Sequence, residues 1–147
     1  MQFTTSALGD IGHVIQLAIA PVFLLTAVGT LLNVLVNRLG RSVDRRRTLV
    51  AALPELVDAL AEGARAELEY VARRVKLIYT AILLAVLCAL LICLLIALAF
   101  MDALFAADLA QVVAVLFVLA MVALIGSLAL FLREIYLGVN TVASPLR

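Results

Sequence analysis

Charged side chains are missing from three long apolar stretches of this chain, at residues 14–36, 77–100 and 110–132. The chain as a whole is 67% hydrophobic and has a mean hydropathy of +1.24, which is outside the range of soluble globular domains. Each stretch is long enough to cross a bilayer core of about 30 Å as a helix. The composition therefore predicts an integral membrane protein with three transmembrane helices. Without ionisable residues in these spans, a proton relay of the usual kind is not expected.

Groups that carry metal or nucleophilic chemistry are also scarce. The single histidine, His13, and the nearby Asp10 supply two zinc ligands, fewer than the three or four that a zinc site needs. Cys88 and Cys93 point about 140° apart on a helix, so they neither pair nor share a metal readily. Ser127 has no evident base. We expect no catalytic residue, metal site or cofactor, and no enzyme activity.

The basic residues are confined to one part of the chain. Nine of the eleven Lys and Arg residues fall in residues 38–76, and none lies in residues 1–37 or between Lys76 and Arg133. Because Lys and Arg in short loops stay in the cytoplasm, this distribution predicts an outer amino terminus and a cytoplasmic carboxyl terminus in the inner (plasma) membrane. The first stretch is longer than the apolar region of a secretory signal and is interrupted by Pro21, so we expect it to remain in the mature protein.

Basic residues beside a span attract anionic lipids, here at the inner leaflet, by about 1 kcal/mol each. Arg45, Arg46 and Arg47 are the candidates for contact with lipid or with a cytoplasmic protein partner. A nucleic acid is not an expected partner, because no aromatic side chains are interleaved with the basic ones.

Helical periodicity continues through the basic segment. Leu39, Val43 and Val50 maintain the apolar spacing of the first helix, and Pro54 then favours the start of a second helix that continues to Met101. The sequence thus predicts an all-α membrane protein with a cytoplasmic helical hairpin. The expected segments are an outer segment with transmembrane helix 1 at 1–37, the hairpin at 38–76 with its turn near 51–54, transmembrane helix 2 at 77–101, an outer turn at 102–109, transmembrane helix 3 at 110–132 and a cytoplasmic tail at 133–147. Arg133 and Glu134 are expected to anchor the third span to the hairpin.

Small side chains recur at a four-residue interval in the second span. Because lipid supplies no hydrophobic drive between helices, close approach along small residues favours helix packing. The predicted packing residues are Ala81, Ala85, Ala89, Cys93 and Ala97. Three helices enclose little interior by themselves, so we expect a homo-oligomer.

Polar side chains form a stripe along the first span. The candidate lining residues of this stripe are Gln16, Phe23, Thr26, Thr30, Asn33, Asn37 and Arg41. Unpaired amides are costly in hydrocarbon, so the stripe should face protein or water. Two interpretations remain open: hydrogen bonds between helices or to the helix's own backbone, and copies of the first helix lining a pathway around an axis.

Several blocks of the sequence form a recognisable pattern: residues 18–25, Gly29, Leu32, Asn33, residues 37–47, residues 69–74, Ala81, Ile82 and residues 131–135. In these blocks the chain resembles an uncharacterised bacterial membrane protein family, domain of unknown function 2721. The resemblance covers most of the chain from Ile15 to Leu137. It implies a three-span membrane protein of bacterial type and no particular activity. Ser42 stands where the family tends to have a branched aliphatic residue.

These observations support three hypotheses for function. The first is a homo-oligomeric ion channel or conduit lined by transmembrane helix 1, in which Arg41 and its neighbours bias ion transport toward anions. The alternative is a membrane scaffold or assembly factor that recruits a partner through the hairpin, where Glu62, Arg65, Glu69 and Arg73 form a ladder of alternating charge. A third is a lipid-binding protein that uses Arg45 to Arg47.

Overall fold

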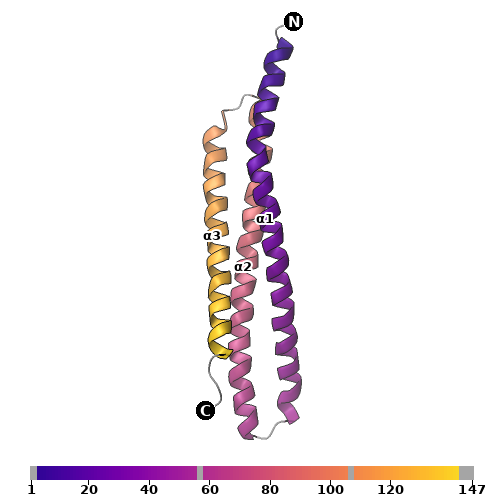
Figure 1. Ribbon diagram of the computed structural model, residues 1–147, viewed down its shortest axis with the longest axis vertical. Coiled ribbons are helices and arrows are strands. Elements are labelled where there is room, and N and C mark those ends of the chain that lie inside the picture. Colours follow the sequence, from indigo (N-terminus) through magenta and orange to yellow (C-terminus); the bar gives the residue numbers. More distant parts are fainter. Residues whose placement is uncertain (1–2, 56–57, 106–107, 143–147) are drawn as a thin grey trace. The chain divides into compact units, whose positions relative to one another are not determined.

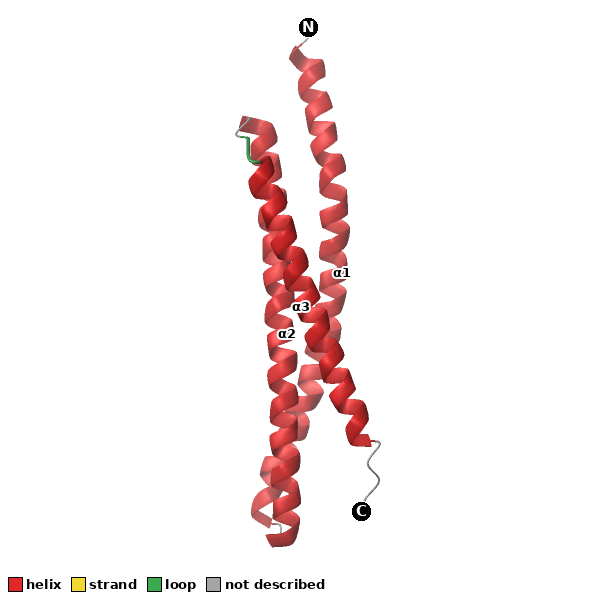
Figure 2. Ribbon diagram, turned by 90° about the vertical axis from the view of Figure 1, so that its left-hand side faces the viewer, coloured by secondary structure: helices red, strands yellow, loops and turns green. Residues whose placement is uncertain are grey.

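Three long helices account for almost all of the structure, a computed structural model that describes residues 3–55, 58–105 and 108–142. They are α1 (Phe3–Ala52), α2 (Asp58–Phe105) and α3 (Ala110–Val142), and a short 3₁₀ helix, η1 (Leu53–Glu55), follows α1. Figures 1 and 2 show these helices, with no strand among the described residues. All three are long and apolar enough to cross a membrane. The predicted all-α, three-span fold is confirmed.

Helix α1 continues from the first apolar stretch far into the basic segment. It has 50 residues and includes Pro21 and Gly40 in its interior. Glycine costs about 1 kcal/mol in a helix interior, which the flanking helix formers offset. Pro54 lies in η1, so α2 begins at Asp58 rather than at Pro54. Tighter 3₁₀ turns are common where a chain reverses between helices.

The opposite end of α2 lies four residues beyond the expected Met101, at Phe105. There the Asp102 carboxylate accepts a hydrogen bond from the backbone N–H of Leu109 at 3.0 Å, and Asp108 adopts a φ of 51°. A short acidic side chain tolerates this left-handed conformation better than most residues do. Helix α3 extends past the expected boundary at residue 132 as far as Val142.

The chain divides into two compact units. The first comprises the described residues of Met1–Leu31 and Leu84–Ile125. Its buried apolar residues are Val28, Ala85, Cys88, Ile92, Leu95, Ala120 and Ala123. Large apolar side chains such as Phe23, Leu90 and Val118 are exposed on this unit. An exposed apolar surface of this kind is typical of a helix that faces lipid.

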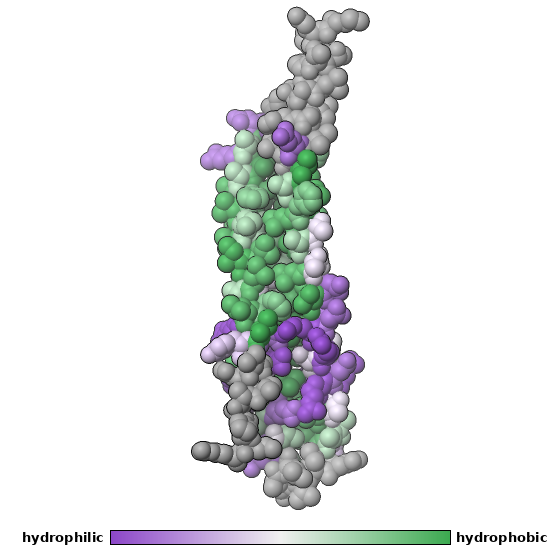
Figure 3. All heavy atoms as spheres, in the orientation of Figure 1, coloured by the Kyte–Doolittle hydropathy of each residue, from purple (hydrophilic) through white to green (hydrophobic). Residues whose placement is uncertain are grey.

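The second unit comprises the described residues of Leu32–Leu83 and Gly126–Arg147. Its buried apolar residues are Leu35, Leu49, Ala61, Val71, Ile78 and Ala81. The hydroxyl of Ser127 in α3 is also buried and donates to the backbone carbonyl of Ala81 in α2 at 2.8 Å. The basic residues of the described chain all belong to this unit, and Figure 3 shows the hydrophilic side chains that gather on its visible face.

Candidate functional site

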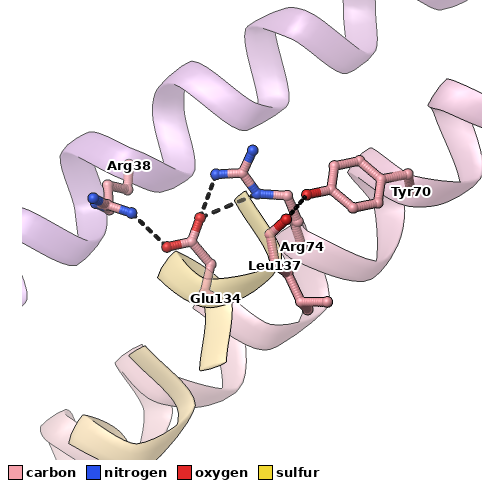
Figure 4. Close-up of polar contacts among 5 residues, drawn as sticks. All are labelled: Arg38, Tyr70, Arg74, Glu134 and Leu137. Carbon is pink, nitrogen blue, oxygen red and sulfur yellow. Dashed lines mark hydrogen bonds and ion pairs between the residues drawn. The ribbon is translucent and has the colours of Figure 1, made fainter. Parts of the chain in front are cut away.

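A buried carboxylate joins the three helices within the second unit. Glu134 of α3 is 0% exposed. Arg38 of α1 donates from Nη1 to its Oε2 at 2.6 Å, and Arg74 of α2 donates from Nε to its Oε1 at 3.1 Å. The Arg74 Nη2 also binds Oε1. Figure 4 shows the carboxylate between the two guanidinium groups, so both of its oxygens have partners.

Aromatic rings cover the two arginines of this cluster. The Arg38 guanidinium lies 5.2 Å from the centre of the Phe131 ring, and the Arg74 guanidinium lies 5.9 Å from that of Tyr70. The Tyr70 hydroxyl donates in turn to the backbone carbonyl of Leu137 at 2.7 Å (Figure 4). A cation over an aromatic face is attracted to the ring quadrupole. The Phe131 contact holds Arg38 toward α3, and the Tyr70 hydroxyl joins α2 to α3 beside Arg74.

The charges of the cluster do not cancel. One carboxylate faces two guanidinium groups, whose side chains are 31% and 29% exposed. A buried carboxylate is stable only when hydrogen-bonded cations compensate for its lost hydration, and here both oxygens are compensated. The surplus positive charge remains partly accessible to solvent.

The place of these residues in the sequence explains why they meet. Arg38 follows the first apolar stretch, Arg74 precedes the second and Glu134 follows the third. Each therefore lies just beyond the same end of a span, where a charged side chain is far less costly than at the centre of the bilayer. The expected anchoring of the third span to the hairpin is confirmed for Glu134. Arg133 is exposed, and no described carboxylate lies within ion-pair distance of it.

A cationic cleft of about 320 Å³ lies beside the cluster on the second unit. It is lined by Arg38, Arg41, Ser42, Arg45, Val71 and Arg74. Arg45 binds Glu67 through Nε at 2.9 Å and through Nη2 at 2.6 Å, and the two side chains are 55% and 42% exposed. Arg41 has no described carboxylate partner. The lining is thus polar and strongly positive.

The predicted polar stripe lies on the outside of the single chain. Thr26 and Thr30 donate to the backbone carbonyls of Val22 and Thr26, at 3.2 and 3.1 Å. The Asn37 amide donates to the side-chain oxygen of Asn33 at 3.2 Å. The two threonine hydroxyls are therefore hydrogen-bonded to the backbone of their own helix, as one interpretation of the sequence expects. Within the described chain, the Asn33 amide nitrogen makes no hydrogen bond.

The structure places the other predicted site residues as follows. The exposed ones are Gln16, Phe23, Thr26, Thr30, Asn33, Asn37, Arg41, Arg45, Arg46, Arg47, Cys93 and Ala97; Ala81 and Ala85 are buried, and Ala89 is half-buried. The small residues of α2 thus split between the interior and the surface. The side chains of Asp10 and His13 lie outside the described residues.

The sequence pattern did not predict that Arg38 and Arg74 bind Glu134, nor that the Tyr70 hydroxyl binds the backbone of Leu137. One signal was present, because Glu134 is the single acidic residue that follows the third span. Among the described residues, no group of three His, Cys, Asp or Glu side chains could hold a metal ion.

Together, the fold and the cluster define a multi-pass helical membrane protein with three spans tied by ion pairs at one end. Residues 18–144 match the family described as Protein of unknown function (DUF2721), and the chain belongs to that family. The resemblance drawn from the sequence is therefore confirmed. Comparison with curated proteins and with solved structures found no match.

Proposed function

We propose that this protein is a homo-oligomeric conduit for small ions in the inner membrane, lined by the polar stripe of α1. The single observation that carries the proposal is the exposure of this stripe on the isolated chain, including Asn33 and Asn37. A polar side chain that is left uncovered in a span with an unpaired donor or acceptor needs a partner from outside the chain. A second copy of α1 offers the same amides and hydroxyls and is therefore self-complementary.

The depth of Asn33 makes its exposure costly. Asn33 precedes Arg38 by five residues, which is about 7.5 Å along the helix at 1.5 Å per residue. If Arg38 marks the edge of the bilayer, Asn33 lies within the hydrocarbon. The Asn33 side-chain oxygen accepts a hydrogen bond from Asn37, but the Asn33 amide nitrogen has no partner within the described chain, and an unpaired donor at this depth is costly. Thr26 and Thr30, by contrast, pair with their own backbone. Asn33 thus gives the strongest reason for assembly.

The charges along α1 indicate the selectivity of such a conduit. Its span contains no ionisable residue, and rings of amide and hydroxyl groups discriminate weakly between ions. Arg41 continues the stripe at the basic end and lines the cationic cleft. We expect this end, at the cytoplasmic mouth, to concentrate anions.

Substitution of Asn33 by Leu tests both parts of the proposal. An interhelical hydrogen bond in a membrane is worth about 1 kcal/mol, so N33L should lower the association constant about fivefold. Val36→Leu is the matched control, because Val36 is also exposed on α1 but carries no polar group. Subunit counting in bilayers measures assembly, and anion flux into proteoliposomes measures conduction. A monomeric wild-type protein would refute assembly, and an oligomer without flux would refute conduction alone.

A second candidate function is recruitment of a cytoplasmic partner by the hairpin. The observation that favours it is the exposure of Arg46, Arg47 and Arg65, for which no described carboxylate lies within ion-pair distance. A photo-crosslinking residue in place of Arg47 should then capture a protein other than this chain in cells. The triple variant with Gln at these three positions should abolish a partner's recovery while leaving the Glu134 cluster intact.

A further inference from the structure

A groove of about 490 Å³ lies between α2 and α3 within the second unit. Its lining residues from α2 recur every three or four positions, at Tyr70, Arg73, Leu77 and Thr80. Its lining from α3 follows the same spacing, at Leu130, Arg133 and Leu137, and Arg74 and Lys76 complete the wall. One face of each helix therefore contributes to the groove.

The groove changes from polar to apolar along its length. Leu77 and Thr80 follow Lys76 toward the apolar centre of α2, and Leu130 precedes Arg133 on the corresponding side of α3. The cations thus lie toward the end of the spans, together with Tyr70 and Leu137, whereas the lining toward the membrane centre carries no charge. This order matches that of a phospholipid, whose headgroup lies at the interface and whose acyl chains lie in the core.

The cations of this groove exceed the carboxylates that neutralise them. Arg73 pairs with Glu69 at 2.9 Å, and Arg74 shares Glu134 with Arg38. Lys76 and Arg133 line the groove, and in the described part of the chain neither has a carboxylate within ion-pair distance. Four cations therefore face two carboxylates. This surplus favours a ligand with a net negative charge.

We propose that the groove binds one anionic phospholipid, with its phosphate held by Lys76 and Arg133 and an acyl chain packed along Leu77 and Leu130. Basic recesses between transmembrane helices on the cytoplasmic side are suited to such headgroups. A soluble phosphate would bind the cations but would make no contact with Leu77 and Leu130. A zwitterionic lipid is a poorer ligand than an anionic one, because its own cation is repelled by the unpaired basic residues.

The site is formed by one chain and does not depend on the proposed conduit. It is also distinct from Arg45, Arg46 and Arg47, the positions at which the sequence predicts lipid or partner contact. A protein that assembles without flux can still hold this lipid, and a monomer can hold it as well.

Native mass spectrometry of the purified full chain tests the proposal, with micelles doped with either phosphatidylglycerol or phosphatidylcholine. The wild type should retain one phosphatidylglycerol in preference to phosphatidylcholine. The double variant K76Q/R133Q should lower this retention about thirtyfold, the combined effect of two basic residues. The single variants K76Q and R133Q should each lower retention about fivefold. Their matched control is R65Q, which loses the same charge from an exposed position outside the groove and should change retention less than twofold.

Three outcomes would overturn the proposal. One is a loss in R65Q equal to the loss in K76Q or R133Q, which means that only the general positive charge attracts lipid. Another is the absence of a headgroup preference in the wild type, which leaves the groove to a different occupant. The third is full displacement by equimolar glycerol phosphate, which means that the acyl chain contributes nothing. The single variants K76Q and R133Q repeat the test if thermal unfolding shows that the double variant is misfolded.

Discussion

At the scale of the residue, Glu134 is the one charged side chain of the described residues that is fully buried. Its carboxylate is buried, and two guanidinium groups from two other helices satisfy both of its oxygens. A buried ion pair is a poor source of net stability compared with apolar packing, but removing one partner leaves an uncompensated charge. The cluster thus penalises any arrangement of the second unit in which the three helices are separated.

Substitution of Glu134 by Gln should destabilise the protein strongly. The amide keeps the shape of the side chain, but it leaves Arg38 and Arg74 without a counter-charge. Breaking a buried pair in this way costs about 3–5 kcal/mol. Unfolding in detergent micelles, followed by circular dichroism, measures the loss.

The matched control for this substitution is Glu69→Gln, which removes an exposed i,i+4 pair with Arg73. Exposed pairs contribute less than about 1 kcal/mol. Equal stability of the E134Q and E69Q proteins would show that the buried cluster does not hold the helices together.

At the scale of the element, the spans were predictable from the sequence because length and hydropathy decide them. The three apolar stretches coincide with α1, α2 and α3, and helix α1 also continues past Gly40. The exact ends of the helices were less predictable. They depend on local contacts such as the one between Asp102 and Leu109, which a hydropathy pattern does not contain.

The interior face of α2 was only partly predictable, for a geometric reason. A step of four residues turns a helix by about 40° beyond a full turn, so a strict four-residue row drifts around the helix. Ala81 and Ala85 are buried, whereas Cys93 and Ala97 are exposed. The buried residues of α2 in the first unit are instead Ala85, Cys88, Ile92 and Leu95, at alternating steps of three and four residues. This alternation is the spacing that keeps one face toward a neighbouring helix.

Leucine substitutions should distinguish the buried alanines of this row from the exposed ones. Ala85→Leu forces extra volume into a closely packed interior and should cost about 1–3 kcal/mol of folding stability. Ala97→Leu is the matched control, because Ala97 is exposed and has room for the larger side chain. Unfolding of both variants in micelles, where copies are diluted, compares them. A large loss in A97L, or none in A85L, would contradict the assignment of the interior face.

At the scale of the whole molecule, the candidate site depends on contacts between distant parts of the sequence. Arg38 and Glu134 are 96 positions apart, and Arg74 and Glu134 are 60 positions apart. Charge counts alone show that these residues lie at the same end of their spans. They do not show which cation binds which carboxylate, because nine basic residues compete within residues 38–76. The alignment of the three helices decides the pairing.

The distribution of Lys and Arg predicts the orientation in the membrane, and cysteine labelling can measure it. We expect the hairpin on the cytoplasmic side and the turn between α2 and α3 on the outer side, because positively charged loops resist translocation. Arg47 lies exposed on the hairpin, and Phe105 lies exposed at the end of α2. The cysteine variants R47C and F105C, made with Cys88 and Cys93 replaced by Ala, report the two sides.

A membrane-impermeant maleimide applied to spheroplasts should label F105C at once and R47C only after permeabilisation. Labelling of both variants in permeabilised cells controls for the reactivity of each thiol. The reverse pattern would mean that the basic hairpin faces outward. In that case neither Arg41 nor Lys76 and Arg133 would meet the cytoplasmic leaflet, and both the mouth of the conduit and the lipid groove would have to be reassigned to the outer surface.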